Sequence, residues 1–346
     1  MPVNRTSPLR KIPKVELHRH LDGSIRQETI VDISKRNNLD IDISDIARLK
    51  KRSTVTEPMQ DLAAVLEAFD TIQKVSCCYE AIKRIAYENV EDAFFDGIKL
   101  IELRFSPAFI SFEKEINNDE IIEGVIDGVV EGMVKYEIQV GLITIVSRTL
   151  DYDANKQATS DFISYAKKGY HYGSDRLVGF DLADRENTTD PSDFSELVAM
   201  SRQAGLGITV HSVEDTGAFG VEKTLEVLEP DRIGHGVNAW QNMDVVEMLK
   251  ERDVLLEICP TSNWLTQCVP ILEKHPLPDF YRAGVKVSIN SDDPQLMDID
   301  LTHEYEIAQK YYGFTNDDFK KMNLYALEKS FLPNEIVKTV EKAFFN

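Results

Sequence analysis

Short apolar runs alternate with helical segments along almost the whole chain, and this alternation limits the possible folds more than any other feature. Eight runs indicate strands, at 15–20, 98–105, 139–146, 177–183, 207–211, 232–236, 254–258 and 285–290. Most are followed by a segment whose apolar residues have helical spacing. Strands separated by helices pair in parallel through right-handed crossovers, and eight such units close into a (β/α)8 barrel.

The predicted helices lie between these strands and continue after the last one. We expect extra helices inserted after the first strand, at 26–36 and 57–75, and at the C-terminus, at 301–311, 317–330 and 335–343. The others are predicted at 81–95, 119–135, 160–168, 193–204, 221–228, 244–251 and 277–283. A barrel with insertions accommodates 346 residues, so we expect one α/β domain, a TIM barrel, over 1–346.

The charge balance argues against several kinds of partner. The chain has 39 Lys and Arg against 59 Asp and Glu, a net charge of −20 and a sequence pI near 4.8. A surface this acidic disfavours nucleic acid and anionic membranes, so we expect neither as a partner. The chain shows no signal peptide, no membrane-spanning run and no zinc-type spacing of its four cysteines. We therefore expect a cytoplasmic enzyme with reduced thiols.

Four of the seven histidines and two adjacent aspartates fall where predicted strands end. In a barrel of this type the chemistry lies at the carboxyl ends of the strands. On a strand, alternate side chains share a face, so two histidines two positions apart can converge on one cation. These residues are His18, His20, His211, His235, Asp292 and Asp293. The other histidines, His171, His275 and His303, are expected on the surface or in loops.

Three histidines and one carboxylate form a donor set that suits zinc or a similar first-row divalent ion, with a position left for water. Such an ion lowers the pKa of that water to roughly neutrality and makes hydroxide available. Only three of the four histidines can be ligands if one handles protons. Glu214 lies three residues past His211. It could therefore reach over the site and donate a proton to a ring nitrogen of a substrate.

Several motifs resemble those of the adenosine deaminase family of metal-dependent hydrolases, and its bacterial members in particular. The most specific are ELHRHLDG at 16–23 and SINSDDP at 288–294. Further similar motifs lie at 80–88, 102–107, 179–183, 209–211, 232–236 and 259–263. The resemblance covers nearly the whole chain. It implies a hydrolase of purine metabolism and purine salvage with one zinc ion per chain.

The resemblance also implies residue roles. His235 would orient and deprotonate the attacking water, and Glu214 would protonate purine N1 so that C6 becomes electrophilic. The implied reaction converts adenosine and 2′-deoxyadenosine to inosine and 2′-deoxyinosine plus ammonia through a tetrahedral C6 intermediate. The implied zinc ligands are His18, His20, His211 and Asp292.

The implied substrate contacts come from separate parts of the chain. Asp293 would bind purine N7, and the backbone N–H at Asp184 would face N3. Asp22, with His20 nearby, would hold the ribose 5′-hydroxyl. The predicted helix at 57–75 would cover the ribose side, and its apolar residues there are Val65, Leu66 and Phe69.

Two positions depart from the pattern of the family and concern the identity of the substrate. Family members usually have glycine where this chain has Asp184, so a side chain could crowd the base or sugar. Val213, before Glu214, replaces another glycine and is stiff at χ1. The alternative substrates are related 6-aminopurines, namely adenine or an N6-substituted or 5′-modified adenosine. Asp22 argues for a free 5′-hydroxyl, because a carboxylate would repel a phosphate by about 4 kcal/mol at 4 Å near a surface.

Two other classes of function are weighed against these deaminases. A binding or signalling module with an inactive barrel would lack metal or release no ammonia from adenosine. Deaminases that act on bases in polynucleotides carry a His-x-Glu and Pro-Cys-x-x-Cys zinc signature, and this chain has none.

Overall fold

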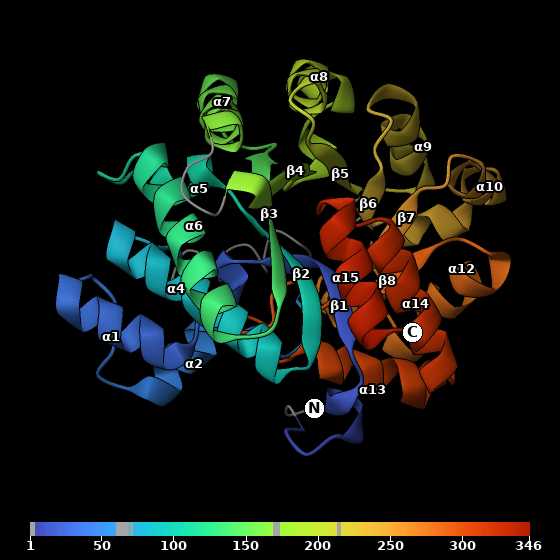
Figure 1. The fold of residues 1–346 in the computed structure, drawn as a ribbon, viewed down its shortest axis with the longest axis horizontal. Helices are drawn as coiled ribbons and strands as arrows, with labels where there is room; N and C mark the ends of the chain where they lie inside the picture. Colours follow the sequence, from blue (N-terminus) through green and yellow to red (C-terminus); the bar gives the residue numbers. More distant parts are fainter. Residues whose placement is uncertain (1–3, 60–68, 70–71, 169–173, 213–215) are drawn as a thin grey trace.

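The structure, a computed structural model, describes residues 4–59, 69, 72–168, 174–212 and 216–346. Eight parallel strands form one sheet in chain order, as the sequence predicts for a (β/α)8 barrel (Figure 1). The strands are β1 (Lys14–His20), β2 (Ile98–Phe105), β3 (Gln139–Ser147), β4 (Leu177–Ala183), β5 (Gly207–Ser212), β6 (Arg232–His235), β7 (Leu255–Ile258) and β8 (Val287–Ile289).

The last strand and the first meet at a seam near their carboxyl ends. The N–H of His20 donates to the carbonyl of Asp292 at 2.9 Å, and the N–H of Asp292 donates to the carbonyl of His18 at 3.1 Å. Nearer the start of the two strands, the N–H of Leu17 donates to Oδ1 of Asn290 at 2.9 Å. The seam therefore brings the two ends of the sheet together at the rim where the polar residues were predicted.

Helices surround the strands, and the extra helices predicted after β1 and at the C-terminus are present (Figure 1). Of the helix predicted at 57–75, most residues lie outside the described part, whereas 69, 72 and 73 are helical. The helices are α1 (Gln27–Asn37), α2 (Ile46–Ser53), α4 (Tyr79–Phe95), α5 (Pro107–Ser111), α6 (Asn118–Lys135), α7 (Tyr152–Lys168), α8 (Ser195–Gln203), α9 (Ala218–Val227), α10 (Met243–Glu251), α11 (Pro260–Leu265), α12 (Leu277–Ala283), α13 (Leu301–Tyr312), α14 (Asn316–Glu328) and α15 (Asn334–Phe344).

The prediction missed α2, α5 and α11 and began α7 eight residues too late. The first half of α7 has no apolar stripe because Asn155 and Thr159, both fully buried, face the barrel there. Nδ2 of Asn155 donates to the carbonyl of Ser147 at 2.8 Å, and its Oδ1 accepts the Ser147 N–H at 3.1 Å. This helix therefore docks onto the end of β3 through polar groups, which periodicity does not detect.

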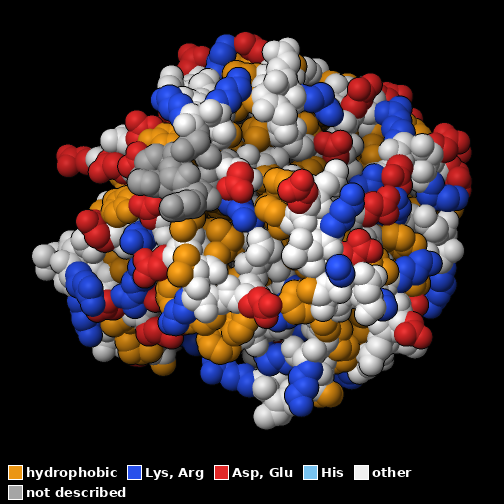
Figure 2. All heavy atoms as spheres, in the orientation of Figure 1, with side chains coloured by type: hydrophobic (Ala, Val, Ile, Leu, Met, Phe, Trp, Pro, Cys, Tyr) orange, Lys and Arg blue, Asp and Glu red, His pale blue; other side chains and the backbone are white. Residues whose placement is uncertain are grey.

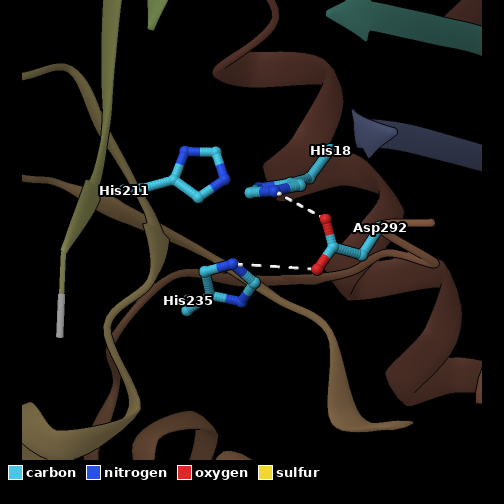
Figure 3. A group of neighbouring side chains, drawn as sticks. All are labelled: His18, His211, His235 and Asp292. Carbon is cyan, nitrogen blue, oxygen red and sulfur yellow. Dashed lines mark ion pairs between the residues drawn. The ribbon is translucent and has the colours of Figure 1, made fainter. Parts of the chain in front are cut away.

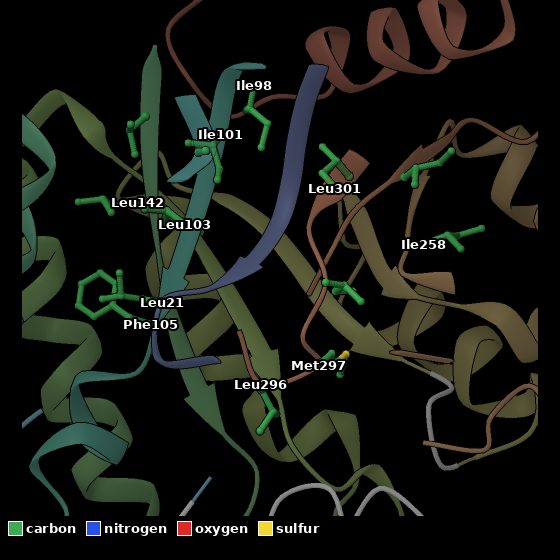
Figure 4. Packing of buried hydrophobic residues seen from close by; sticks show 14 of the residues in the cluster. Leu21, Ile98, Ile101, Leu103, Phe105, Leu142, Ile258, Leu296, Met297 and Leu301 are labelled. Carbon is green, nitrogen blue, oxygen red and sulfur yellow. The ribbon is translucent and has the colours of Figure 1, made fainter. Parts of the chain in front are cut away.

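Apolar side chains fill the layer between the strands and the helices. Leu103 and Phe105 of β2, Leu142 of β3 and Ile258 of β7 are fully buried in one large cluster (Figure 4). The apolar runs that predicted the strands thus form the packed interior, and this burial is the main stabilising contribution to the fold.

The C-terminal segment closes the amino-terminal mouth of the barrel. The guanidinium carbon of Arg232 lies 3.6 Å from the ring centroid of Phe331. Oε1 of Glu102 accepts hydrogen bonds at 2.7 Å from both the Ser330 hydroxyl and the Phe331 N–H. Any substrate must therefore approach from the opposite mouth, at the carboxyl ends of the strands.

Acidic and basic side chains are interspersed over the face of the molecule drawn in Figure 2. Among the described residues, no helix combines the length and apolar character needed to cross a bilayer.

Candidate active site

Three side chains from separate strands and one from the segment after β8 meet at the carboxyl-terminal mouth of the barrel. One potential ligand atom from each of His18, His211, His235 and Asp292 lies within 4.8 Å of the other three (Figure 3). Nε2 of His18 is 3.2 Å from Oδ1 of Asp292, and Nε2 of His235 is 3.8 Å from Oδ2. Three imidazoles and a carboxylate at these separations form a buried group that could bind a metal ion.

His20, the remaining histidine of the predicted group, borders this cluster. Its Nε2 lies 3.3 Å from Oδ1 of Asp292 and 3.3 Å from Nε2 of His211. Its side chain is 14% exposed, whereas those of the other three histidines are 6% exposed or less. All five donors therefore converge, and His20 lies at the accessible side of the group.

Buried carboxylates hold two of these imidazoles from behind. Nδ1 of His18 lies 2.8 Å from Oε2 of Glu257, and Nδ1 of His211 lies 3.0 Å from Asp181. A carboxylate only accepts hydrogen bonds, so both Nδ1 atoms carry a proton, and each Nε2 keeps a lone pair when its ring is neutral. Metal-binding histidines in proteins characteristically have this support, which fixes the tautomer and the ring orientation.

Arg104 joins the two supporting carboxylates beneath the site. Its guanidinium donates to Asp181 and to Glu257, each at 2.8 Å, and all three side chains are fully buried. For Asp181 the attraction of His211 and then of Arg104 outweighs burial, and for Glu257 that of Arg104 and Arg232 does, so the pKa of both carboxyls is held well below the usual range. The sequence predicted no role for Arg104, Asp181 and Glu257. The feature of the sequence that could have indicated them is a charged residue inside an otherwise apolar strand.

The protonation of the cluster suits cation binding. Burial lowers the pKa of His20 and of His235 well below the usual value, so both are neutral near pH 7. Burial also opposes the charge on Asp292, but the neighbouring His18 outweighs it and holds the pKa of this carboxyl well below the usual range. Asp292 and Glu257 in turn raise the pKa of His18 against the opposing effects of burial and Arg104. Without a metal ion the cluster therefore presents a carboxylate and the neutral imidazoles of His20 and His235, which are groups that bind divalent cations.

Gly234 of β6 provides the space for His18. A Cβ atom at this position would lie 2.9 Å from Cε1 of His18 and 3.3 Å from the Cα of His211. Ordinary contacts of a Cβ atom begin near 3.4 Å. Steric space thus explains why position 234 is glycine, because any side chain there would displace the imidazole of His18.

Asp22 and Gln73 form a buried polar pair beside the cluster. Nε2 of Gln73 donates to Oδ2 of Asp22 at 2.7 Å, and the two side chains are 7% and 6% exposed. Burial raises the pKa of Asp22 to about 6. Oδ1 of Asp22 and Oε1 of Gln73 are buried and have no hydrogen-bond partner in the described part of the chain. The pair therefore presents two acceptors. The sequence predicted Asp22 as a site residue but not Gln73.

Asp293 lies against the turn that carries Asp22. A Cβ atom on Gly23 would fall 1.7 Å from Oδ1 of Asp293, so the carboxylate occupies the space that any other residue there would fill. Asp293 follows Asp292 in the chain and Asp22 lies two residues after His20, so both aspartates lie next to the histidine cluster. Their contact with a substrate stays a prediction.

Asp184 follows β4 and has a left-handed backbone, with φ of 80°. Oδ2 of its carboxylate accepts hydrogen bonds from Ser147 at 2.6 Å and from the hydroxyl of Thr149. Its Oδ1 accepts the N–H of Arg185 at 2.8 Å. The side chain is therefore tied to the end of β3. These bonds offset the conformational strain that a glycine would avoid.

Several predicted residues cannot be placed. Glu214, Val213, Val65 and Leu66 lie outside the described residues, whereas Phe69 is buried, with 8% exposure, in the apolar cluster.

The expectation that His275 and His303 lie on the surface or in loops is wrong for His303, whereas His275 does lie in a loop, before α12, although it is buried. The two residues are 2% and 4% exposed, and His303 belongs to α13. His275 lies between helices and uses both ring nitrogens in hydrogen bonds to Asn263 and to the N–H of Leu277. The error arose because a histidine outside a strand end was treated as solvated. His171, expected with them, lies outside the described residues.

A parallel eight-stranded barrel with a buried His-His-His-Asp group at the carboxyl ends of its strands defines a class of barrel proteins with a candidate metal centre. The family model described as adenosine deaminase matches residues 13–343. An adenosine deaminase of Shewanella loihica is 34% identical over 332 residues, which cover 96% of this chain and 98% of that protein. The chain belongs to the adenosine deaminase family.

Solved structures share the fold. An adenine deaminase of Arthrobacter aurescens superposes with a TM-score of 0.84 at 24% identity, covering 96% of this chain and 97% of that one. An N6-mAMP deaminase of Arabidopsis superposes with a TM-score of 0.83 at 24% identity, covering 97% and 98%. At these identities the likeness extends to the barrel and not to the choice of substrate.

Proposed function

We propose that this chain is a zinc-dependent enzyme that deaminates adenosine and 2′-deoxyadenosine by hydrolysis. The observation that carries the proposal is the convergence of four histidines and Asp292 at one mouth of the barrel. The family match over nearly the whole chain supports the same reaction. A cytoplasmic location, a role in purine salvage and a single-domain organisation remain part of this proposal.

The proposed zinc ligands are His18, His20, His211 and Asp292. The fit of this set rests on chemistry seen in the site. Nε2 of His18 is buried with no hydrogen-bond partner in the described chain, and the opposite ring nitrogens of two ligands are held by carboxylates. A zinc ion in such a site supplies a water of lowered pKa as the nucleophile.

Protein side chains supply the remaining steps. Glu214 donates a proton to purine N1, which withdraws electrons from C6 and opens it to attack. His235, beside Asp292, orients the attacking water. Asp293 and the N–H of Asp184 hold the base. Release of ammonia from the tetrahedral C6 completes the reaction: one proton of the attacking water leaves with the amino group, and the other restores the proton that Glu214 gave to N1.

The acceptor pair of Asp22 and Gln73 favours a substrate with a free 5′-hydroxyl. A hydroxyl donates one hydrogen bond, whereas a phosphate at neutral pH offers only acceptors and carries negative charge. Burial makes the pair reject a phosphate more strongly, because a buried acceptor that faces another acceptor has lost its water and gained no hydrogen bond. Nucleotides are therefore proposed to be poor substrates, and free adenine leaves the pair without a partner.

Steady-state kinetics test the proposal. Ammonia release is measured for adenosine, 2′-deoxyadenosine, AMP, adenine and N6-methyladenosine, together with the zinc content of the purified protein. We expect about one zinc per chain and kcat/KM for adenosine at least 10²-fold above that for AMP or adenine, a gap of about 3 kcal/mol. Efficient turnover of AMP or of an N6-substituted compound would instead favour the alternative substrates.

Asp22→Asn gives a sharper version of the same test. Removing the charge weakens the repulsion of a 5′-phosphate, so the preference for adenosine over AMP should narrow. An unchanged preference would show that Asp22 does not face the 5′ position.

A further inference from the structure

Three buried hydrogen bonds connect the imidazole of His235 to a backbone amide of a distant helix. The N–H of Leu277, the first residue of α12, donates to Nδ1 of His275 at 3.0 Å. Nε2 of His275 lies 3.1 Å from Oδ1 of Asn263, and Nδ2 of Asn263 lies 3.0 Å from Nδ1 of His235. Asn263, His235 and His275 are 0%, 1% and 2% exposed, so water does not compete for these bonds.

The donor and the acceptor of each hydrogen bond in this series are fixed by the first bond, which starts at a backbone N–H. A backbone N–H always donates, so Nδ1 of His275 is an acceptor, and the single proton of this imidazole is on Nε2. Burial lowers the pKa of His275 to about 3, which keeps the ring neutral. The Nε2–H of His275 requires an acceptor and so turns the carbonyl oxygen of Asn263 toward itself. The amide nitrogen of Asn263 then faces His235 and donates to its Nδ1.

We infer that Asn263 and His275 are positioning residues that hold His235 as the Nε2–H tautomer. The protonated Nε2 faces Asp292, 3.8 Å from Oδ2. A nitrogen that carries its proton has no lone pair for a cation, and it cannot accept a proton from water. In this tautomer His235 acts as a hydrogen-bond donor that orients the water.

The same reasoning separates the histidines of the cluster. Nδ1 of His18 and of His211 faces a carboxylate, so their Nε2 atoms are free to bind a cation. Nδ1 of His235 instead faces an amide donor, so its Nε2 carries the proton and is not free to bind a cation. Proximity alone admits all three as ligands, whereas the supporting hydrogen bonds exclude His235.

The consequence of this tautomer for turnover rests on the proposed deaminase function, whereas the tautomer assignment does not.

Nuclear magnetic resonance of metal-free protein labelled with ¹⁵N at histidine tests the assignment. Long-range ¹H–¹⁵N correlations report which ring nitrogen carries the proton, and the signals of His235 are those missing from His235→Gln. We expect Nε2–H for His235 in the wild type. In Asn263→Asp, a carboxylate accepts from both rings, so the proton of His235 should move to Nδ1.

Turnover gives a second readout. With the wrong tautomer, kcat of zinc-loaded Asn263→Asp should fall on the order of 10²-fold or more, with KM within about threefold. Asn323→Asp is the matched control, since Asn323 is 1% exposed and accepts the N–H of Val15 at 2.7 Å on β1. It introduces a similar buried charge and should leave His235 as Nε2–H.

If Asn263→Asp does not fold, His275→Gln replaces it, and His235 should then populate both tautomers. A proton on Nδ1 of His235 in the wild type, or an unchanged tautomer in both variants, overturns the inference. Wild-type protein that deaminates none of the purines while showing the expected spectra overturns the proposed function and supports the tautomer assignment.

Discussion

Gly234→Ala tests whether the position of His18 determines metal binding. The new Cβ would lie 2.9 Å from Cε1 of His18, so the ring must retreat by about 0.5 Å or more to reach an ordinary contact. Metal–ligand distances tolerate only about 0.2 Å. The φ angle of Gly234 lies outside the left-handed region, so alanine introduces no backbone strain.

We expect two effects of different origin. Overpacking beside the buried ring should lower the free energy of unfolding of the metal-free protein by about 1–3 kcal/mol. Displacement of a ligand should weaken zinc affinity by about 10–100-fold, or about 1.4–2.7 kcal/mol. Competition against a chromophoric chelator measures the affinity, and denaturant unfolding measures the stability.

Gly217→Ala is the control for this experiment. Its Cβ would have one neighbour, Oε1 of Gln241, at 3.7 Å, which is an ordinary contact. Zinc affinity of Gly234→Ala within twofold of both the control and the wild type would refute the assignment of His18 as a ligand fixed by packing.

Further substitutions test other parts of the site. Asp292→Ala should reduce bound zinc toward zero by elemental analysis, and full occupancy would reject it as a ligand. Glu214→Gln should retain zinc but lose most turnover, whereas near-normal kcat would place proton donation elsewhere. Because β3 hydroxyls hold its carboxylate, Asp184→Gly should leave the KM for adenosine near wild type and lower stability by about 1 kcal/mol; a rise in activity would show that the side chain restricts the pocket. Burial raises the pKa of Glu304 from 4.5 to about 8. The free energy of unfolding of the wild type should therefore fall as the pH rises from 4.5 to 8, by at most about 5 kcal/mol. Glu304→Gln should remove this dependence when unfolding is measured across that pH range.

Apolar patterning predicted the barrel well where strands are buried and sharply bounded. β2 and β4 have the predicted limits, 98–105 and 177–183. Gly97, with φ of 83°, ends the preceding helix, and Ser106 and Pro107 start the next one. Helices whose barrel-facing residues are polar, such as the start of α7, could not be predicted because their buried side is not apolar.

The donors could be predicted because barrel topology places strand ends together, whereas their supporting groups could not. Asp181 and Glu257 appear in the sequence as single charges within strands, which equally suit a solvated face. His275 gave no signal, because its importance depends on contacts with Asn263 and Leu277 that only the folded chain creates.

The seam between β8 and β1 determines when the chain can first hold a metal ion. The partners Leu17 and Asn290 are 273 positions apart, so the closing contacts join the earliest and the latest parts of the barrel. During synthesis the ribosome releases the first two histidines long before Asp292 emerges. Metal capture is therefore expected as a late event of biogenesis, after the eighth strand has docked, and a truncated nascent polypeptide should be unable to retain the ion.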